Sequence, residues 1–206
     1  HISGFRFSSV MPEGGYTTPL GEVTIDSQLA DAIIKAGANS STPIRTSDQG
    51  HRTEYGYGEH CIEVQLPFLQ VIDEDIRIVP IIMGDQSYGA ACSLGKAIAE
   101  AAGDKNIVLI ASTDLSHYYT QREAEVLDSI LLRELESYNL ERLAEKLENR
   151  ETQACGSGAI MTVMYASRLL GADQSRILDY RTSGDSPYGD YERVVGYVSA
   201  TFERTG

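Results

Sequence analysis

The chain has 206 residues, with 30 acidic and 17 basic side chains and a net charge of −13 at neutral pH. This acidic balance argues against non-specific nucleic-acid binding, because phosphate contacts need a basic surface. Hydrophobic residues make up 42% of the chain and charged residues 23%, which is the composition of a folded globular protein and not of a disordered one. The length suits one domain with a sizeable core.

No apolar run reaches the roughly 18 residues that a membrane span needs, so we expect no membrane association. The three cysteines, Cys61, Cys92 and Cys155, show neither a CxxC pair nor another zinc-binding spacing. An odd and sparse number of cysteines fits free thiols in a reducing compartment better than a disulfide framework. These features predict a cytoplasmic protein.

The first part of the chain predicts a strand followed by a helix. Residues 21–25 alternate in polarity as a short strand does. Asp26 is a typical N-terminal cap for a helix that continues through Lys35 and closes at Gly37. Residues 38–58 have no hydrophobic period and predict a long loop, a length that is uncommon unless the loop is functional or mobile. We expect His51, inside this loop, to be exposed.

The middle of the chain predicts a helix, a strand and a second helix. The first helix covers residues 59–71, with Pro67 as a kink. A strand follows over residues 76–83. The second helix covers residues 88–102 and ends at Gly103.

The last part of the chain continues the alternation of strands and helices. An apolar strand is predicted over 106–111, charged amphipathic helices over 121–138 and 140–148, an apolar helix from 155 to 170, and strands over 175–180 and 193–202. The acidic residues of the charged helices are expected to face solvent: Glu134, Glu136, Glu145 and Glu148. This alternation predicts a three-layer α/β domain with a central mixed sheet between helices, in which 76–83 and 106–111 are neighbours.

The strand predicted over 106–111 leads directly into a polar cluster that contains Asp114 and His117. Apolar runs of this length are typical of buried strands in α/β sheets. Ligands of open α/β sheets bind beyond the carboxyl ends of the strands, so both residues are candidates for a functional site. The alternative is an ordinary strand-to-helix loop in which Ser112 or Asp114 caps the next element.

Cys155 is a second candidate, because it is predicted at the N-terminus of a helix beside Gly156 and Gly158. The helix dipole and free N–H groups there favour a thiolate. His117 could act as an acid or base near neutral pH, with Asp114 tuning it. We therefore expect Asp114, His117 and Cys155 to open into one shared pocket.

His60 and Glu63 are three residues apart, so they share one face of the helix predicted over 59–71. In such a pair the carboxylate can fix the tautomer of the imidazole. We expect both side chains to be partly buried supports of the pocket wall and not direct ligands. The alternative is a solvated pair of charges.

Several short blocks, in order along the whole chain, resemble motifs of the Memo family. The segment Glu59–Pro67, EHCIEVQLP, is similar to the family's EHSIExxLP block, and Ser112–Tyr118, STDLSHY, resembles its SSDxSHY block. The remaining similarities are the TPLG turn at Thr18–Gly21, the Cys-Gly pair at Cys155–Gly156 and the closing strand at Gly196–Ala200. Each block is weak by itself, whereas the ordered set is specific. Prokaryotic members of this family are called AmmeMemoRadiSam system protein B.

The resemblance implies a fold like that of the class III extradiol dioxygenases, which hold non-haem iron with two histidines and a carboxylate. The matching pocket of Memo proteins looks like two histidines plus the cysteine, with Asp114 and His117 beside it. By position, one of these histidines is His1, so His1 and Cys155 are the implied metal ligands; the alternative is that His1 is a tag remnant. The resemblance further implies that residues 1–206 form a single Memo-like domain that lacks the family's N-terminal segment and its other histidine.

Three functions remain open from the sequence. The first is a metal-dependent redox protein that uses copper or iron, since thiolate and imidazole form a soft to borderline ligand set. The second is a non-catalytic pocket protein that binds a peptide or a small molecule. The third is a metal-free thiol enzyme with Cys155 as nucleophile and His117 as base. The family name also implies a functional link to a radical-SAM protein.

Overall fold

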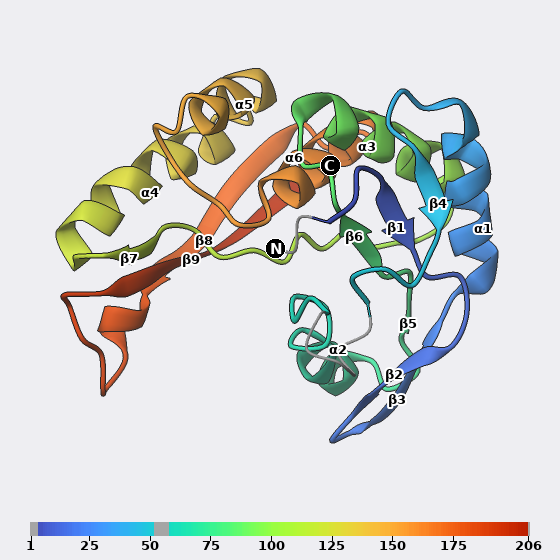
Figure 1. Ribbon diagram of the computed structural model, residues 1–206, viewed down its shortest axis with the longest axis horizontal. Helices are drawn as coiled ribbons and strands as arrows, with labels where there is room; N and C mark the ends of the chain where they lie inside the picture. The colour runs from blue at the N-terminus through green and yellow to red at the C-terminus, as the bar shows by residue number, and fades with distance from the viewer. Residues whose placement is uncertain (1–3, 52–57, 206) are drawn as a thin grey trace. The chain divides into compact units, whose positions relative to one another are not determined.

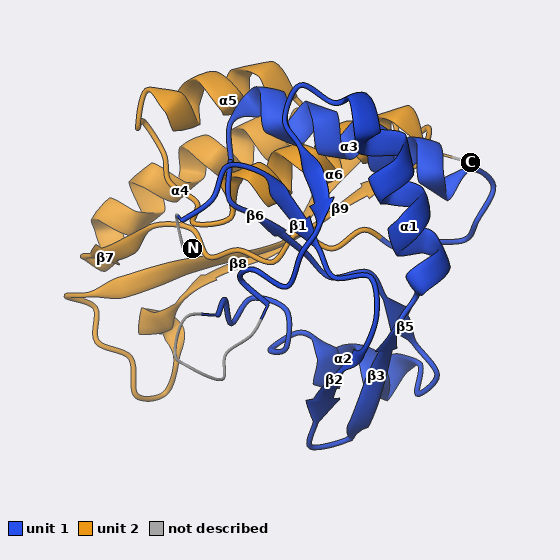
Figure 2. Ribbon diagram, turned by 45° about the vertical axis from the view of Figure 1, so that its right-hand side comes forward, with its two compact units in different colours: residues 1–108 blue, residues 109–206 orange. Residues whose placement is uncertain are grey.

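The computed structural model describes residues 4–51 and 58–205. His1, a predicted metal ligand, lies outside the described residues. The chain divides into two compact units, residues 1–108 and residues 109–206 (Figure 2).

Unit 1 contains two three-stranded mixed sheets. In the first, β1 pairs parallel with β4 and antiparallel with β6; in the second, β3 pairs antiparallel with β2 and parallel with β5. The strands are β1 (Ser8–Val10), β2 (Gly15–Thr18), β3 (Gly21–Ile25), β4 (Ile44–Thr46), β5 (Arg77–Ile78) and β6 (Ile81–Met83).

Two helices of unit 1 begin at residues whose side chains cap them. In α1 (Ser27–Ala36), the predicted cap Asp26 accepts a hydrogen bond from the Leu29 N–H, and in α3 (Tyr88–Ala102) Ser87 accepts from Ala90. Each side chain satisfies an N–H group that the first helical turn leaves unpaired. The short 3₁₀ turn η1 (Gly37–Asn39) follows α1, and α1 packs against α3.

The described residues of unit 2 form one antiparallel sheet and three α-helices, whose arrangement Figure 1 shows. The strand order is β7-β9-β8. These elements are β7 (His117–Tyr119), α4 (Gln121–Glu136), α5 (Leu140–Glu148), α6 (Ser157–Leu169), β8 (Gln174–Thr182), the 3₁₀ turn η2 (Ser183–Asp185) and β9 (Val194–Glu203).

The core of unit 2 forms where α4 packs on β8 and β9 while α5 packs on α4 and α6. Apolar residues at helical spacing provide it, and these side chains are fully buried: Leu131, Leu140, Leu143 and Met164. The amphipathic pattern predicted for these helices is therefore confirmed.

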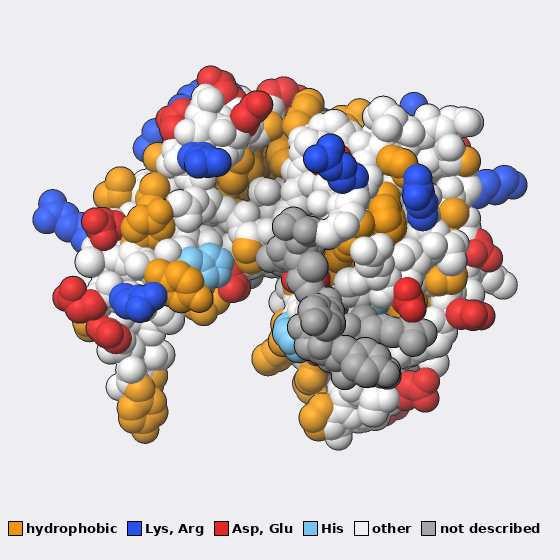
Figure 3. All heavy atoms as spheres, in the orientation of Figure 1, with side chains coloured by type: hydrophobic (Ala, Val, Ile, Leu, Met, Phe, Trp, Pro, Cys, Tyr) orange, Lys and Arg blue, Asp and Glu red, His pale blue; other side chains and the backbone are white. Residues whose placement is uncertain are grey.

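The outer face of α4 and α5 carries acidic side chains interspersed with lysine and arginine, as Figure 3 shows. Glu136, Glu145 and Glu148 are at least partly exposed on these helices, as predicted. The prediction for Glu134 is wrong: it is buried, with its Oε1 3.6 Å from Arg142 Nη2.

The α/β class is confirmed, with mixed sheets and six α-helices in the described residues. The prediction of a single central sheet is wrong, because the described strands form three separate sheets. The strand predicted over 76–83 is interrupted before Pro80, and its halves β5 and β6 join different sheets. Proline has no N–H to donate to a ladder, which explains the break.

The prediction of a strand over 106–111 is also wrong, and so is the predicted pairing of this segment with residues 76–83. No described residue forms a strand there, and Val108 is 84% exposed. An apolar run becomes a strand only where another strand presents its hydrogen-bonding edge. The chain meets such an edge, that of β9, only further along. There Leu115 N donates to Gly196 O and Gly196 N donates to Ser116 O, both at 2.9 Å.

The helix predicted over 59–71 is shorter than expected, since α2 covers only Leu66–Ile72. Pro67 lies in its first turn, where the missing N–H costs nothing, so the proline starts the helix and does not kink it. His60 and Glu63 consequently lie in the turns before α2. No helix in the described part of the chain is long and apolar enough to cross a membrane.

A buried carboxylate, Asp128 on α4, connects three elements of unit 2. Its side chain is 0% exposed. Oδ1 accepts a hydrogen bond from the Ser116 N–H at 3.0 Å, and Oδ2 accepts one from the Tyr180 hydroxyl of β8 at 2.8 Å. Burial raises the pKa of Asp128, and the hydrogen bonds from Tyr180 and Ser116 partly offset this effect. A Cβ at residue 196 would overlap this carboxylate, so the position on β9 requires Gly196.

The raised pKa of Asp128 predicts how its substitution changes the pH dependence of stability. The folded protein keeps the proton on Asp128 over a range in which the unfolded chain has lost it, so this residue's contribution to the free energy of unfolding falls as pH rises from about 4 through the raised pKa. An asparagine at this position would keep an acceptor for Ser116 but would not titrate. Asp128→Asn should therefore gain stability relative to wild type as pH rises from about 4 to about 7, measured by urea unfolding. A pH-independent difference would contradict this prediction.

Candidate functional site

The site begins with the segment Thr113–His117, which neighbouring elements hold in an extended conformation. β9 binds its middle through backbone bonds between Gly196 and the residues Leu115 and Ser116, and Asp128 holds the Ser116 N–H. Because these bonds involve the backbone of the segment, they set its position whatever side chains it carries. Asp114 and His117 therefore project from a fixed backbone.

The loop before α6 binds to the same segment. Cys155 N donates to Asp114 O at 3.0 Å, Asp114 N donates to Cys155 Sγ at 3.2 Å, and Gly156 N donates to Thr113 Oγ1 at 2.7 Å. Two chain segments that are far apart in sequence thus exchange both backbone and side-chain hydrogen bonds. The Asp114 N–H thereby holds the Cys155 sulfur beside this segment.

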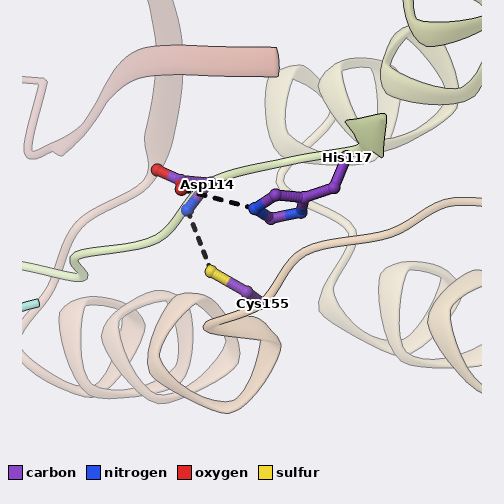
Figure 4. Close-up of side chains that lie close together, drawn as sticks. All are labelled: Asp114, His117 and Cys155. Carbon is purple, nitrogen blue, oxygen red and sulfur yellow. Dashed lines mark hydrogen bonds and ion pairs between the residues drawn. The ribbon is translucent and has the colours of Figure 1, made fainter. Parts of the chain in front are cut away.

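These contacts bring Asp114, His117 and Cys155 together, as Figure 4 shows. One donor atom from each of the three lies within 4.8 Å of the others, and Asp114 Oδ2 is 3.4 Å from His117 Nε2. All three residues are partly exposed, so the group is open to small molecules. The structure places the three predicted residues at one site, while their individual roles remain predictions.

Strained backbone follows His117 directly. Tyr118 has φ +66°, and the pairing of β7 with β9 shifts register between His117 and Tyr119. A left-handed residue other than glycine costs on the order of 1 kcal/mol, and β-bulges commonly re-aim side chains beside active sites. The ring of Tyr118 lies 5.1 Å from the Arg193 guanidinium, a cation–π contact that helps to hold it.

Tyr197 of β9 is a residue of this neighbourhood that the sequence analysis did not single out. Burial raises the pKa of Tyr197, and the negative charge of Asp114 raises it further. The phenol therefore stays protonated at neutral pH and offers an O–H group near the carboxylate. It lies within the Gly196–Ala200 block quoted above, but nothing in that block marked the tyrosine as more than a strand residue.

A cavity of about 380 Å³ opens beside the three residues, and His117 and Cys155 line it together with residues of α5, α6 and the segment that joins them. Arg150, Thr152 and Gln153 supply its polar wall. Of the three residues predicted to share a pocket, His117 and Cys155 line this cavity and Asp114 does not. The strand predicted to lead into the pocket is absent from the described residues.

The predicted supporting pair lies in unit 1. His60 Nδ1 is 2.5 Å from Glu63 Oε1, with side chains 72% and 30% exposed. The pairing of the carboxylate with the imidazole is confirmed, although it forms in turns and not on a helix. His60 is not partly buried as predicted, while Glu63 is.

His51 is not exposed, contrary to the prediction from its loop. Only 6% of it is accessible. Its Nε2 lies 3.0 Å from Ser9 O and its Nδ1 lies 3.1 Å from the Tyr16 hydroxyl. Burial lowers the pKa of His51, since a charged imidazole would lose its hydration. A polar loop composition could not reveal this tertiary pairing.

Comparison with known proteins identifies the family of the chain. The Memo-like protein family matches residues 1–201. A MEMO1 family protein of Methanobrevibacter smithii is 39% identical over 95% of the chain and 66% of its own length. Others from Desulfurococcus amylolyticus and Nitrosopumilus maritimus are both 36% identical over 98% of the chain, and over 69% and 70% of their own lengths. The chain belongs to the Memo-like family, and it spans about two thirds of the length of these relatives.

The contact between the two segments predicts a different outcome for two Gly→Ala substitutions. A Cβ at residue 156 would lie 2.8 Å from both Ser112 O and Thr113 Cβ, whereas a Cβ at Gly89, in the first turn of α3, meets nothing within 4 Å. We expect Gly156→Ala to destabilise the protein by about 1–3 kcal/mol and Gly89→Ala to leave stability unchanged or raise it slightly. Urea unfolding of both variants measures this. Equal stability of the two variants would contradict the close approach at Gly156.

Proposed function

We propose that this Memo-like protein is a metal-dependent redox protein that binds copper or iron at Asp114, His117 and Cys155. The observation that carries the proposal is the convergence of a carboxylate oxygen, an imidazole nitrogen and a thiol sulfur within 4.8 Å. His1 remains a predicted further ligand outside the described residues.

The separation of the carboxylate and imidazole donors fits a single metal ion. Nitrogen and oxygen ligands at about 2.0–2.2 Å from one tetrahedral ion stand about 3.3–3.6 Å apart. The separation of Asp114 Oδ2 and His117 Nε2 is 3.4 Å. Asp114 N also donates a hydrogen bond to the Cys155 sulfur, and cysteine binds metals as the thiolate.

The chemistry of the donors supports copper or iron over magnesium or calcium. Thiolate and imidazole suit transition metals, whereas the oxygen-loving ions prefer carboxylates, carbonyls and water. An extradiol dioxygenase holds iron with two histidines and a carboxylate, while the described centre offers one histidine, one carboxylate and a cysteine. This difference supports electron-transfer or oxidation chemistry of another kind over ring cleavage. A bound copper or iron ion would supply one-electron redox chemistry.

The residues around the centre would orient and protect it. The backbone bonds to Gly196 and Asp128 hold Asp114 and His117 in position before any ligand arrives, which lowers the ordering cost of binding. Tyr197, a neutral phenol at pH 7 whose pKa burial and the charge of Asp114 raise further, would hold a proton on its phenol oxygen beside the centre. The cavity wall at Arg150 and Gln153 would take up the reacting molecule.

The geometry gives less support to a metal-free thiol enzyme. In a nucleophile–base–acid relay, the carboxylate holds one ring nitrogen of the histidine and the nucleophile faces the other. Here the Asp114 carboxylate faces His117 Nε2, so a relay would need Nδ1 to face the Cys155 sulfur, whereas the contacts found at that sulfur include Asp114 N and Thr113 Oγ1. Three donor atoms of different types within 4.8 Å of one another suit an ion more directly than a relay. A non-catalytic pocket protein is the outcome if no metal binds.

Metal titration tests the proposal. Copper and iron(II) are added separately to EDTA-treated protein under reducing conditions, and bound metal is measured by equilibrium dialysis. The wild type should bind one equivalent of copper or iron, and the bound ion, once oxidised, should show a thiolate-to-metal absorption band. Cys155→Ser should abolish the band and weaken binding by at least about tenfold.

Matched variants separate the roles of the three residues. Cys92→Ser, which removes a thiol on α3, should bind metal as the wild type does. Asp114→Asn and His117→Gln should each weaken binding if both are ligands, whereas unchanged affinity in His117→Gln would return this residue to the acid–base role. Failure of the wild type to bind either metal would favour the non-catalytic pocket protein.

A further inference from the structure

The cavity beside the proposed centre carries a distinctive charge. The chain has 30 acidic and 17 basic residues, yet among the described residues that line the cavity there is neither Asp nor Glu, and Arg150 is a permanent cation. The permanent charge among the lining residues is therefore positive, while the carboxylate of Asp114 lies outside the lining, 3.4 Å from His117 Nε2. A cavity of this kind favours an anion over a cation or a neutral ligand.

Arg150 occupies a backbone position that favours glycine. Arg150 N donates to Leu147 O and Glu151 N donates to Lys146 O, which is the Schellman pattern at the end of α5. Arg150 is the left-handed residue of this pattern, with φ +57°. Glycine is the usual residue there because a Cβ is strained in this conformation. Arg150 is therefore strained in this conformation, and it is one of the residues that line the cavity.

The cation of Arg150 is not used by the ion pairs found within the described part of unit 2. Those pairs are His117 with Asp114, Arg142 with Glu134, Lys146 with Glu151, Arg168 with Glu141 and Arg181 with Asp179. Arg193 lies over the ring of Tyr118. Arg150 is exposed, and its guanidinium can make the paired hydrogen bonds that a carboxylate accepts from arginine.

The rest of the cavity limits the kind of anion. Leu115, Leu147 and Ala154 line it beside the polar residues, so a bound molecule would place apolar atoms against them. One cation balances one negative charge, whereas a phosphate dianion would keep an unbalanced charge near an apolar wall. The volume of about 380 Å³ is at the small end of ligand pockets.

We propose that this cavity binds a small amphipathic monocarboxylate, with the carboxylate on Arg150 and the apolar body reaching toward His117 and Cys155. Binding needs only the cavity and Arg150. The further statement that this molecule is the substrate of the redox centre rests on the proposed function.

The test uses metal-free protein in EDTA, so that its outcome is independent of metal binding. A panel of small carboxylates, straight, branched and aromatic, is titrated together with the matching primary amides and inorganic phosphate. Amide NMR shifts of residues 147–157 report binding. At least one carboxylate should bind with a dissociation constant below about 10 mM, and its amide and phosphate should each bind at least about fivefold more weakly.

Variants of Arg150 distinguish a loss of carboxylate binding from a loss of folding stability. Arg150→Gly removes the cation and places the favoured residue in the left-handed position, so the melting temperature should stay the same or rise while carboxylate affinity falls at least about fivefold. Arg150→Gln should lose the same affinity. Arg133→Gln, which removes an exposed arginine of α4 outside the cavity lining, should bind as the wild type does.

The proposal is overturned if no carboxylate binds, if the amides or phosphate bind as tightly as the carboxylates, or if Arg150→Gly and Arg150→Gln keep wild-type affinity. Metal titration of the same wild-type sample reports separately on the redox centre. Carboxylate binding without metal binding would keep the cavity assignment and overturn the proposed function. Metal binding without carboxylate binding would keep the proposed function and overturn the cavity assignment.

Discussion

The hydrogen bond from the Ser116 N–H to the buried carboxylate of Asp128 is the interaction on which the candidate site depends. It joins α4 to the segment that carries Asp114 and His117, and the Tyr180 hydroxyl extends the connection to β8. A buried carboxylate is costly unless hydrogen bonds satisfy it, so these partners and the carboxylate stabilise one another. The close approach of Gly196 completes this arrangement, since a larger side chain would displace the carboxylate.

This connection lets a loop act as a rigid part of the site. Thr113–His117 forms little regular structure, yet β9, α4 and the loop before α6 each bind it. Ligands placed on such a backbone lose little conformational freedom on binding. The strained Tyr118 and the register shift that follow His117 show how the same contacts set the direction of the imidazole.

Family membership and local geometry contribute different information about this protein. The Memo-like match places residues 1–201 in a family but names no reaction, and a fold can serve many chemistries. The described geometry adds a carboxylate, an imidazole and a sulfur within 4.8 Å and a cavity of about 380 Å³ with the cation of Arg150 at its rim. The proposed redox centre and carboxylate pocket follow from these local features and can fail independently.

The sequence by itself determined the features that depend on local patterns. Caps and periodicity located α1, α3 and the helices of unit 2, and polar residues after an apolar run identified Asp114 and His117. Long-range pairing was decided only in the tertiary structure. The apolar run 106–111 found no partner strand among the described residues, whereas Leu115 and Ser116 paired with Gly196.

The burial of polar side chains, like strand pairing, was decided only in the tertiary structure. His51 and Asp128 are buried by contacts with residues distant in sequence, and Glu134 is buried beside Arg142 of the next helix. No local pattern indicated the burial of these three side chains. Hydrophobic and capping preferences act over a few residues, but burial and strand pairing depend on which segments meet, and only the folded chain specifies that.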